Sequence, residues 1–211
     1  MRAQSLKVFE RLYAGAEHAE DLPWHADEPP PLLVKALAQR EHAGTALDVG
    51  CGAGTYSVFM ARHGYRVTAL DVMPQAIDMV QRQARELSLY IEAHQTDIAT
   101  WSTDQQFDIV LDVGCLHTPG SVDYSVYKSQ LLKWLAPGGD FILLHFGRRG
   151  WWDWWPIGPS RVYPQTIIDL FAPELELVEF VPDHLRKMRP MLGFSALVGK
   201  FWFRRSDAAS T

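Results

Sequence analysis

A short apolar segment that runs into three alternating glycines constrains this chain more than any other feature. Residues 46–54 read Ala-Leu-Asp-Val-Gly-Cys-Gly-Ala-Gly, and a helical pattern follows. A second apolar run, residues 66–70, then ends in Asp71. Strand, glycine turn, helix, strand and acid form the layout of a nucleotide-binding βαβ unit. Glycines let the backbone approach a ligand where a Cβ would clash, and Asp71 can accept hydrogen bonds from two ribose hydroxyls.

The spacing of the glycines indicates which nucleotide. It is G-x-G-x-G rather than the dinucleotide pattern G-x-G-x-x-G, and the absence of G-x-x-x-x-G-K-S/T excludes a P-loop. With Asp48 in front, the segment resembles motif I of the class I S-adenosylmethionine-dependent methyltransferases. Residues 96–98, 107–111 and 135–139 resemble later landmarks of the same family, in the same order. The resemblance covers residues 46–145.

Composition and charge narrow the class of protein. The 211 residues suit one domain with a full core, and 47% hydrophobic with 21% charged residues is an ordinary globular balance. A net charge of -5 argues against nucleic acid as a partner. The sequence contains no run of eighteen apolar residues, so it predicts no membrane-spanning helix. Cys51 and Cys115 have no metal-ligand spacing, and we expect a cytoplasmic protein without a metal.

Alternating strand and helix patterns predict a parallel sheet with helices on both faces. We expect strands at 46–49, 66–71, 89–93, 107–111, 141–144, 175–181 and 195–203, and helices at 6–13, 31–39, 56–63, 74–87, 122–135 and 164–171. Pro137-Gly138-Gly139 should stop the fifth helix. The resemblance implies an α/β fold: a seven-stranded, mostly parallel, doubly wound Rossmann-like sheet with an antiparallel last strand. It also implies one domain, with a helical cap at 1–44, a cofactor-binding core at 45–145 and an acceptor side at 146–211.

The resemblance implies S-adenosylmethionine as cofactor, with S-adenosylhomocysteine as product. The glycines would pass beneath its methionine and ribose, Asp71 would take the ribose and Asp97 the adenine amino group, while Asp48 would organise the turn or meet the amino group through water. The expected cofactor-binding set is Tyr13, Trp24, Asp48, Gly50, Cys51, Gly52, Gly54, Asp71, Val72, Asp97, Ile98, Asp112, Val113 and Gly114. Helix or turn capping is the structural alternative for Asp71 and Asp97, and packing is the alternative for Cys51.

Tyr13 and Trp24 are the expected cap residues. The cofactor's sulfonium is a cation without an N–H, and cation–π attraction to aromatic faces amounts to roughly 0.5–2 kcal/mol. The N-terminal segment resembles the cap of a subgroup that includes thiopurine, thiol and halide methyltransferases. Many members read Pro-Trp-Asp-x-Gly-x-Pro, whereas residues 25–28 here are His-Ala-Asp-Glu. For Trp24 the alternative is a hydrophobic staple on the next helix.

The loop at 112–118 resembles the Asp-x-Gly-Cys-x-His of the same subgroup and should meet the acceptor. His117 is the first candidate for a base or orienting group, and His145 is a weaker one; each has a structural alternative. A thiolate or halide acceptor needs no base. The loop lacks the Asn-Pro-Pro-Tyr motif that marks methylation of adenine, cytosine or glutamine amino groups, and this absence argues against such acceptors.

A tryptophan cluster is the remaining unusual feature. Trp151, Trp152, Trp154 and Trp155 could line an acceptor pocket with Cys115 and His117, form a dimer contact, or make a small separate core. We expect a methyltransferase that acts on a small molecule, a thiol or another soft nucleophile, and that is a monomer or homodimer. The alternatives are O- or N-methylation of an aromatic metabolite and a non-catalytic cofactor-binding protein.

Overall fold

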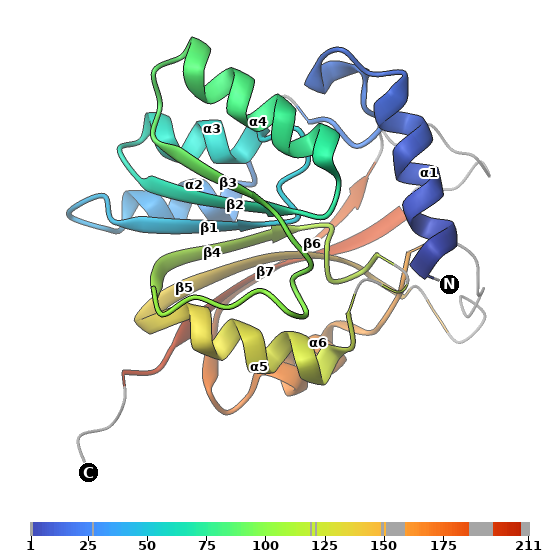
Figure 1. Cartoon of the computed structure of the whole chain (residues 1–211). Coiled ribbons are helices and arrows are strands. Elements are labelled where there is room, and N and C mark those ends of the chain that lie inside the picture. Colours follow the sequence, from blue (N-terminus) through green and yellow to red (C-terminus); the bar gives the residue numbers. More distant parts are fainter. Residues whose placement is uncertain are drawn as a thin grey trace.

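A computed structural model describes residues 2–26, 28–118, 120, 122–148, 150, 159–185 and 196–207. Seven strands form one sheet in the order β3-β2-β1-β4-β5-β7-β6 (Figure 1). The strands are β1 Thr45–Val49, β2 Arg66–Asp71, β3 Ile91–Gln95, β4 Phe107–Val113, β5 Leu135–Phe146, β6 Leu175–Leu185 and β7 Ala196–Arg205.

Only β7 runs against its neighbours. The first five strands pair in parallel, whereas β7 is antiparallel to both β5 and β6. The strand order reverses between β1 and β4, which is the switch point where open α/β sheets bind their ligands. The predicted fold, including the antiparallel last strand, is confirmed.

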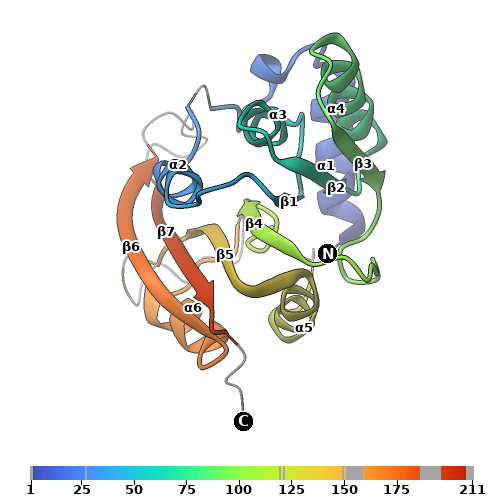
Figure 2. The same cartoon turned by 90° about the vertical axis from the view of Figure 1, so that its left-hand side faces the viewer.

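Helices cover both faces of the sheet. In Figure 1, α2 Pro31–Ala38, α3 Thr55–Arg62 and α4 Pro74–Glu86 lie above it, and α5 Tyr124–Trp134 and α6 Pro164–Phe171 lie below it. The first helix, α1 Arg2–Ala14, does not cover a face: it crosses the end of the sheet and contacts α4 (Figure 2). The described helices include none long and apolar enough to span a bilayer.

The two layers of helices bury separate cores against the sheet. Below it, Tyr127, Trp134 and Phe171 pack on aromatic side chains of β5 and β7. Above it, residues of α2 and α3 pack on β1, β4 and β5, with Trp202 among them. Burial on both faces accounts for the nearly continuous apolar runs of the central strands. The sheet is therefore a rigid platform whose strand ends can carry a site.

Several boundaries differ from the sequence prediction, and two of these differences have a clear structural cause. The third strand, expected at 89–93, occupies Ile91–Gln95, because Leu89 N bonds Ala84 O and so belongs to the end of α4. The Pro137-Gly138-Gly139 segment does not stop α5, which already ends at Trp134; it lies within β5. There Leu135 pairs with Phe107 and Asp140 with Ile109, so the extra residues bulge out of the ladder.

Candidate active site

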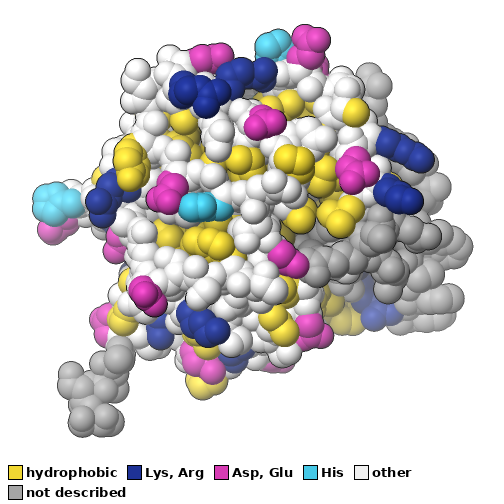
Figure 3. All heavy atoms as spheres, in the orientation of Figure 1, with side chains coloured by type: hydrophobic (Ala, Val, Ile, Leu, Met, Phe, Trp, Pro, Cys, Tyr) yellow, Lys and Arg dark blue, Asp and Glu magenta, His cyan; other side chains and the backbone are white. Residues whose placement is uncertain are grey.

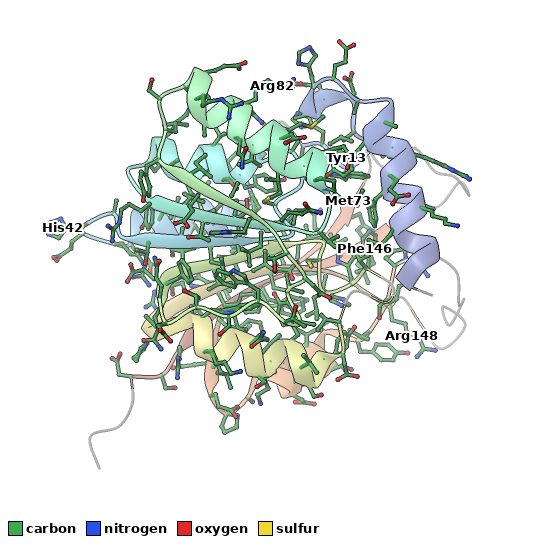
Figure 4. All side chains as sticks on the ribbon, in the orientation of Figure 1. Tyr13, His42, Met73, Arg82, Phe146 and Arg148 are labelled. Atoms are coloured by element: carbon green, nitrogen blue, oxygen red, sulfur yellow. The ribbon has the colours of Figure 1, made fainter. Side chains whose placement is uncertain are left out.

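The predicted site residues converge at the carboxyl ends of β1, β2, β4 and β5. Figure 4 shows Tyr13, Met73 and Phe146 on this side of the molecule, and His42 at the opposite end. Tyr13 ends α1, Met73 follows β2 and Phe146 ends β5. Segments more than a hundred residues apart in the chain therefore meet at one edge of the sheet.

The glycine turn after β1 is closely packed on two sides. Gly50 has φ 70°, and a Cβ placed on it would stand 2.8 Å from Cys115 Cβ in the loop after β4. Gly52 has φ 55°, and a Cβ there would stand 3.5 Å from both Tyr13 Oη and Trp24 Nε1. Any side chain would therefore displace the loop after β4 at Gly50 and would point at Tyr13 and Trp24 at Gly52.

The cap closes directly over this turn. Tyr13 is buried, and Trp24 contacts it edge-on with ring centroids 5.6 Å apart, while Phe9 contacts Trp24 at 5.5 Å. Arg82 of α4 donates to Glu17 O over 2.6 Å and ties the segment between these rings to the core. Both predicted aromatic residues thus lie against the glycine turn.

The two acids of the βαβ unit take different partners. Asp71 Oδ2 accepts from Gly52 N and Oδ1 from Met73 N, each over 2.9 Å, so Asp71 holds the glycine turn as well as the start of α4. Asp48 is buried and accepts a 2.6 Å hydrogen bond from Ser57 of α3. Asp48 thus fixes β1 to the helix that follows the turn, in line with its predicted organising role.

The segment after β3 carries Asp97 on a single tight turn. Ala99 N donates to Asp97 Oδ1 over 3.0 Å, which is the capping contact weighed as an alternative from the sequence. Ile98 is buried in the lower core, whereas Val72 after β2 is 39% exposed. Asp97 therefore has a turn-forming contact, and its adenine role stays a prediction.

Asp112 organises the loop after β4. Its carboxylate is completely buried and accepts hydrogen bonds from Gly114 N at 3.0 Å, Cys115 N at 2.7 Å and Tyr127 Oη at 2.7 Å. The chain leaves β4 at Val113 and enters this loop. Asp112 therefore fixes the loop that carries Cys115 and His117, and any contact between Asp112 and a cofactor stays a prediction.

Three acidic side chains, Asp48, Asp71 and Asp112, lie at this edge of the sheet. Within the described part of the chain, Asp48, Asp71 and Asp112 form no ion pair. Burial raises the pKa of Asp48 to about 7 and that of Asp112 to about 6, and it also raises the pKa of Asp71. Burial, followed by these carboxylates, holds the pKa of both cysteine thiols well above its ordinary value. The edge can accept a positively charged ligand, and its thiols are protonated.

The two candidate histidines lie edge to face, with ring centroids 5.6 Å apart. His145 is engaged at both nitrogens: Nδ1 lies 2.9 Å from Phe146 O and Nε2 lies 3.0 Å from Tyr124 Oη. His117 Nδ1 lies 3.3 Å from Leu144 O, and since a carbonyl only accepts, Nδ1 carries the hydrogen. His117 Nε2, beside Gly114, is then left as the acceptor nitrogen.

Both histidines are kept neutral. Burial, with the neighbouring His145, lowers the pKa of His117 to about 3, and burial likewise lowers the pKa of His145. A neutral His117 can accept a hydrogen bond, but it is a weak base. This geometry favours an orienting role for His117 and a structural role for His145.

Sequence reasoning missed three polar residues that build the site. Ser57 holds Asp48, Tyr124 links His145 to Ser160 Oγ over 3.0 Å each, and Gln130 binds the turn after Asp97. A polar residue on the buried stripe of a helix was the available signal for Ser57 and Gln130. The tryptophan cluster at 151–155 lies outside the described residues, so its three interpretations stay open.

Comparison with known proteins identifies related sequences. Residues 46–139 match the model of a methyltransferase domain. Nodulation protein S of Rhizobium tropici is 33% identical over 134 residues, which are 60% of this chain and 56% of that protein. A probable thiol methyltransferase of Arabidopsis thaliana is 29% identical over 129 residues, 59% of this chain and 56% of that protein. The chain thus spans little more than half the length of these curated relatives.

A solved structure shares the whole fold. The N-methyltransferase NodS from Bradyrhizobium japonicum WM9, in complex with S-adenosyl-L-homocysteine, superimposes with a TM-score of 0.70 and is 24% identical. The match covers 95% of this chain and 98% of that one. At this identity it supports the fold and not the choice of acceptor.

Proposed function

We propose that this chain, whose residues 46–139 match a methyltransferase domain, is a class I methyltransferase that binds S-adenosylmethionine and methylates a small molecule. One observation carries the proposal: the cap aromatics Tyr13 and Trp24 stand over Gly52, and Gly52 is held by Asp71 at the end of β2. Three predicted parts of one cofactor site are adjacent.

The residues of the site fit this cofactor. Bound S-adenosylmethionine supplies an activated methyl group on a positively charged sulfur. Among the described residues, Asp48, Asp71 and Asp112 form no ion pair and would stabilise that charge, and the two aromatic rings suit a sulfonium that cannot donate a hydrogen bond. Asp71 would accept from the ribose and Asp97 from the adenine amino group.

For the acceptor we propose a thiol or another soft nucleophile. The weak basicity of His117, with both nitrogens of His145 engaged, supports an acceptor that arrives without a proton to lose. His117 Nε2 would orient the acceptor. The ring of Phe146, whose centroid lies 4.6 Å from that of His117, would help to exclude water. The second candidate is N- or O-methylation of an aromatic molecule, in keeping with a 29% identical relative from Mycobacteroides abscessus that is named a 2-heptyl-1-hydroxyquinolin-4(1H)-one methyltransferase.

The proposal extends to partners and location. On the face in Figure 3, Lys and Arg side chains are interspersed with Asp and Glu, and the net charge is -5. We therefore propose a small-molecule acceptor rather than a nucleic acid, a cytoplasmic location, and a monomer or homodimer.

The test has two stages. Calorimetry measures binding of S-adenosylmethionine, and mass spectrometry then detects methylated products from an alkyl thiol, a phenol and an aromatic amine. We expect the thiol rate to rise with pH as thiolate accumulates, and His117→Ala to slow it only modestly. A loss of roughly 10²–10⁴-fold would instead identify His117 as a base acting on a phenol or amine. Binding without any product would support the non-catalytic alternative.

A further inference from the structure

The turn that carries Asp97 pairs its own amide hydrogens, but three of its carbonyl groups find no donor within the turn. Thr100 N and Trp101 N donate to Asp97 O over 3.0 and 2.9 Å, and Ala99 N donates to the Asp97 side chain. The carbonyl groups of residues 98, 99 and 101 face α5 instead. The turn is too short to offer these carbonyls further backbone N–H groups, so they need a hydrogen-bond donor from another segment.

Gln130 of α5 supplies that donor. Its amide nitrogen lies 3.2 Å from Ile98 O, 3.3 Å from Ala99 O and 2.9 Å from Trp101 O. The side chain is 7% exposed. An amide nitrogen has two hydrogens, so three carbonyls share them and one side chain gathers the turn.

The orientation of this amide is fixed by chemistry on both sides. Carbonyl oxygens only accept, so the nitrogen of Gln130 must face the turn. On the other side, Lys133 Nζ donates to Gln130 Oε1 over 3.3 Å. Gln130 is thus held in one orientation before any ligand binds.

We propose that Gln130 is a positioning residue for the cofactor's adenine, because it fixes the turn that aims Asp97. The inference rests on the proposed function, in which Asp97 meets the adenine amino group. Gln130 lies on the far side of the turn and acts through Asp97.

The surroundings separate this role from a merely structural one. Ile98 is buried in the lower core, and Trp101 packs on Trp134 with ring centroids 5.5 Å apart, so packing keeps these two residues attached to the core without Gln130, whereas the carbonyls of the turn depend on its amide. An open hollow of about 360 Å³ lies beside Gln130 and would let water reach freed carbonyls. Loss of the amide should therefore loosen the aim of Asp97 more than it destabilises the fold.

The test compares S-adenosylhomocysteine with an analogue in which hydrogen replaces the adenine amino group, both by calorimetry. Intact protein should bind S-adenosylhomocysteine about tenfold more tightly, which is the worth of one hydrogen bond to a charged acceptor. In Gln130→Met, this ratio should fall toward one while the affinity for the analogue changes little.

Gln83 of α4 provides the matched control. Its amide nitrogen donates to Ala53 O in the glycine turn over 2.6 Å, so it fastens the other cofactor loop. Gln83→Met should weaken both ligands equally and preserve the ratio. Lys133→Met, at an exposed position, keeps the Gln130 donors but frees their orientation, and it should lower the ratio partly even if Gln130→Met does not fold.

The outcomes distinguish the inference from the proposed function. A ratio unchanged in both Gln130→Met and Lys133→Met overturns the positioning role, and so does intact protein that binds both ligands equally. Failure of intact protein to bind S-adenosylhomocysteine at all overturns the proposed function itself. A ratio lowered in both variants, and preserved in Gln83→Met, supports the inference.

Discussion

The two ends of the sheet treat buried carboxylates in opposite ways. At the amino end, Asp140 is completely buried and is paired with Arg40 and Arg204, each over 2.8 Å, with Trp202 Nε1 donating as well. At the carboxyl end, Asp48 and Asp112 are as deeply buried but have only uncharged partners within the described residues. Among the described residues, the buried acid at the amino end is paired with cations and those at the carboxyl end are not.

This difference separates an acid that stabilises the fold from acids that are candidates for ligand binding. Burying a charge costs free energy that a paired cation offsets. The amino end has that compensation, so its acid serves the fold. At the carboxyl end no cation among the described residues offsets this cost, and burial raises the pKa of Asp48 and Asp112 instead. A positively charged ligand would favour their ionised forms. Four predictions test this contrast, from the largest expected effect to the smallest.

Asp140→Ala should cause the largest loss of stability. It removes the acid that Arg40 and Arg204 share and the acceptor of Trp202 Nε1, and because the arginine side chains are partly exposed we expect a loss of roughly 2–3 kcal/mol. Urea unfolding measures the change. The control Asp183→Ala removes an exposed partner of Lys200 and should cost less than about 1 kcal/mol. Equal losses in both variants would contradict the view that the amino end is the structural one.

Asp71→Ala should weaken binding rather than folding. It removes a charged acceptor from the carboxyl end, and we expect S-adenosylmethionine binding to lose roughly 1.5–3 kcal/mol. Calorimetry gives the affinity, and urea unfolding checks the fold. Asp78→Ala, on the exposed side of α4, is the control and should change neither. A well-folded Asp71→Ala with unchanged affinity would remove the cofactor assignment at this end.

Trp24→Ala should have a smaller effect on the same end. Loss of one aromatic face over the glycine turn should raise the dissociation constant by an amount equivalent to roughly 0.5–2 kcal/mol. Cofactor should also protect residues 15–29 of the parent protein from proteolysis, and less so in the variant. Tyr90→Ala, at a 67% exposed position, is the control. Cleavage that ignores the cofactor in the parent would make Trp24 a static packing residue.

The last prediction concerns pH. Folding raises the pKa of Asp48 to about 7 and of Asp112 to about 6 from an ordinary 3.8, so the folded chain holds more protons between pH 4 and 7. The free energy of unfolding of the ligand-free protein should therefore fall as pH rises through this window. A cationic ligand favours the carboxylates, so its affinity should rise by up to about tenfold from pH 6 to pH 8.

Calorimetry in buffers of different ionisation enthalpy checks the proton balance. Binding of S-adenosylmethionine near pH 6.5 should release protons from the carboxyl end. The variant Asp183→Ala, which does not alter that end, should release the same number. Binding without proton release would mean that the ligand does not compensate these acids.

Local patterns predicted most of the framework because each depends on neighbouring residues. Pro74 at the start of α4 and Pro164 at the start of α6 mark helices that the structure places at these residues. Apolar runs predicted the central strands, since both faces of the sheet are covered. One error fell where a distant partner decides: β5 begins at Leu135 because β4 pairs with it there.

Local patterns also predicted the part of the site that lies within one βαβ unit. The order of Asp48, the glycines and Asp71 follows from one βαβ unit, and all of them lie at the predicted edge. The sequence could not separate Asp112 from Asp140, since both are acids beside apolar strands. Nor could it show that His145 is engaged by Tyr124, which lies on a helix 21 positions away.

The sequence by itself therefore determined the fold class, the glycine turn and the set of acids at the strand ends, because period and spacing are local properties of the chain. Only the tertiary structure decided which buried acids have a cation, which histidine keeps an acceptor nitrogen, and which glutamine holds the turn of Asp97. Those outcomes depend on burial and on partners up to a hundred residues away, such as Arg40 beside Asp140. Charge compensation is a property of the folded surroundings and not of the residue that carries the charge.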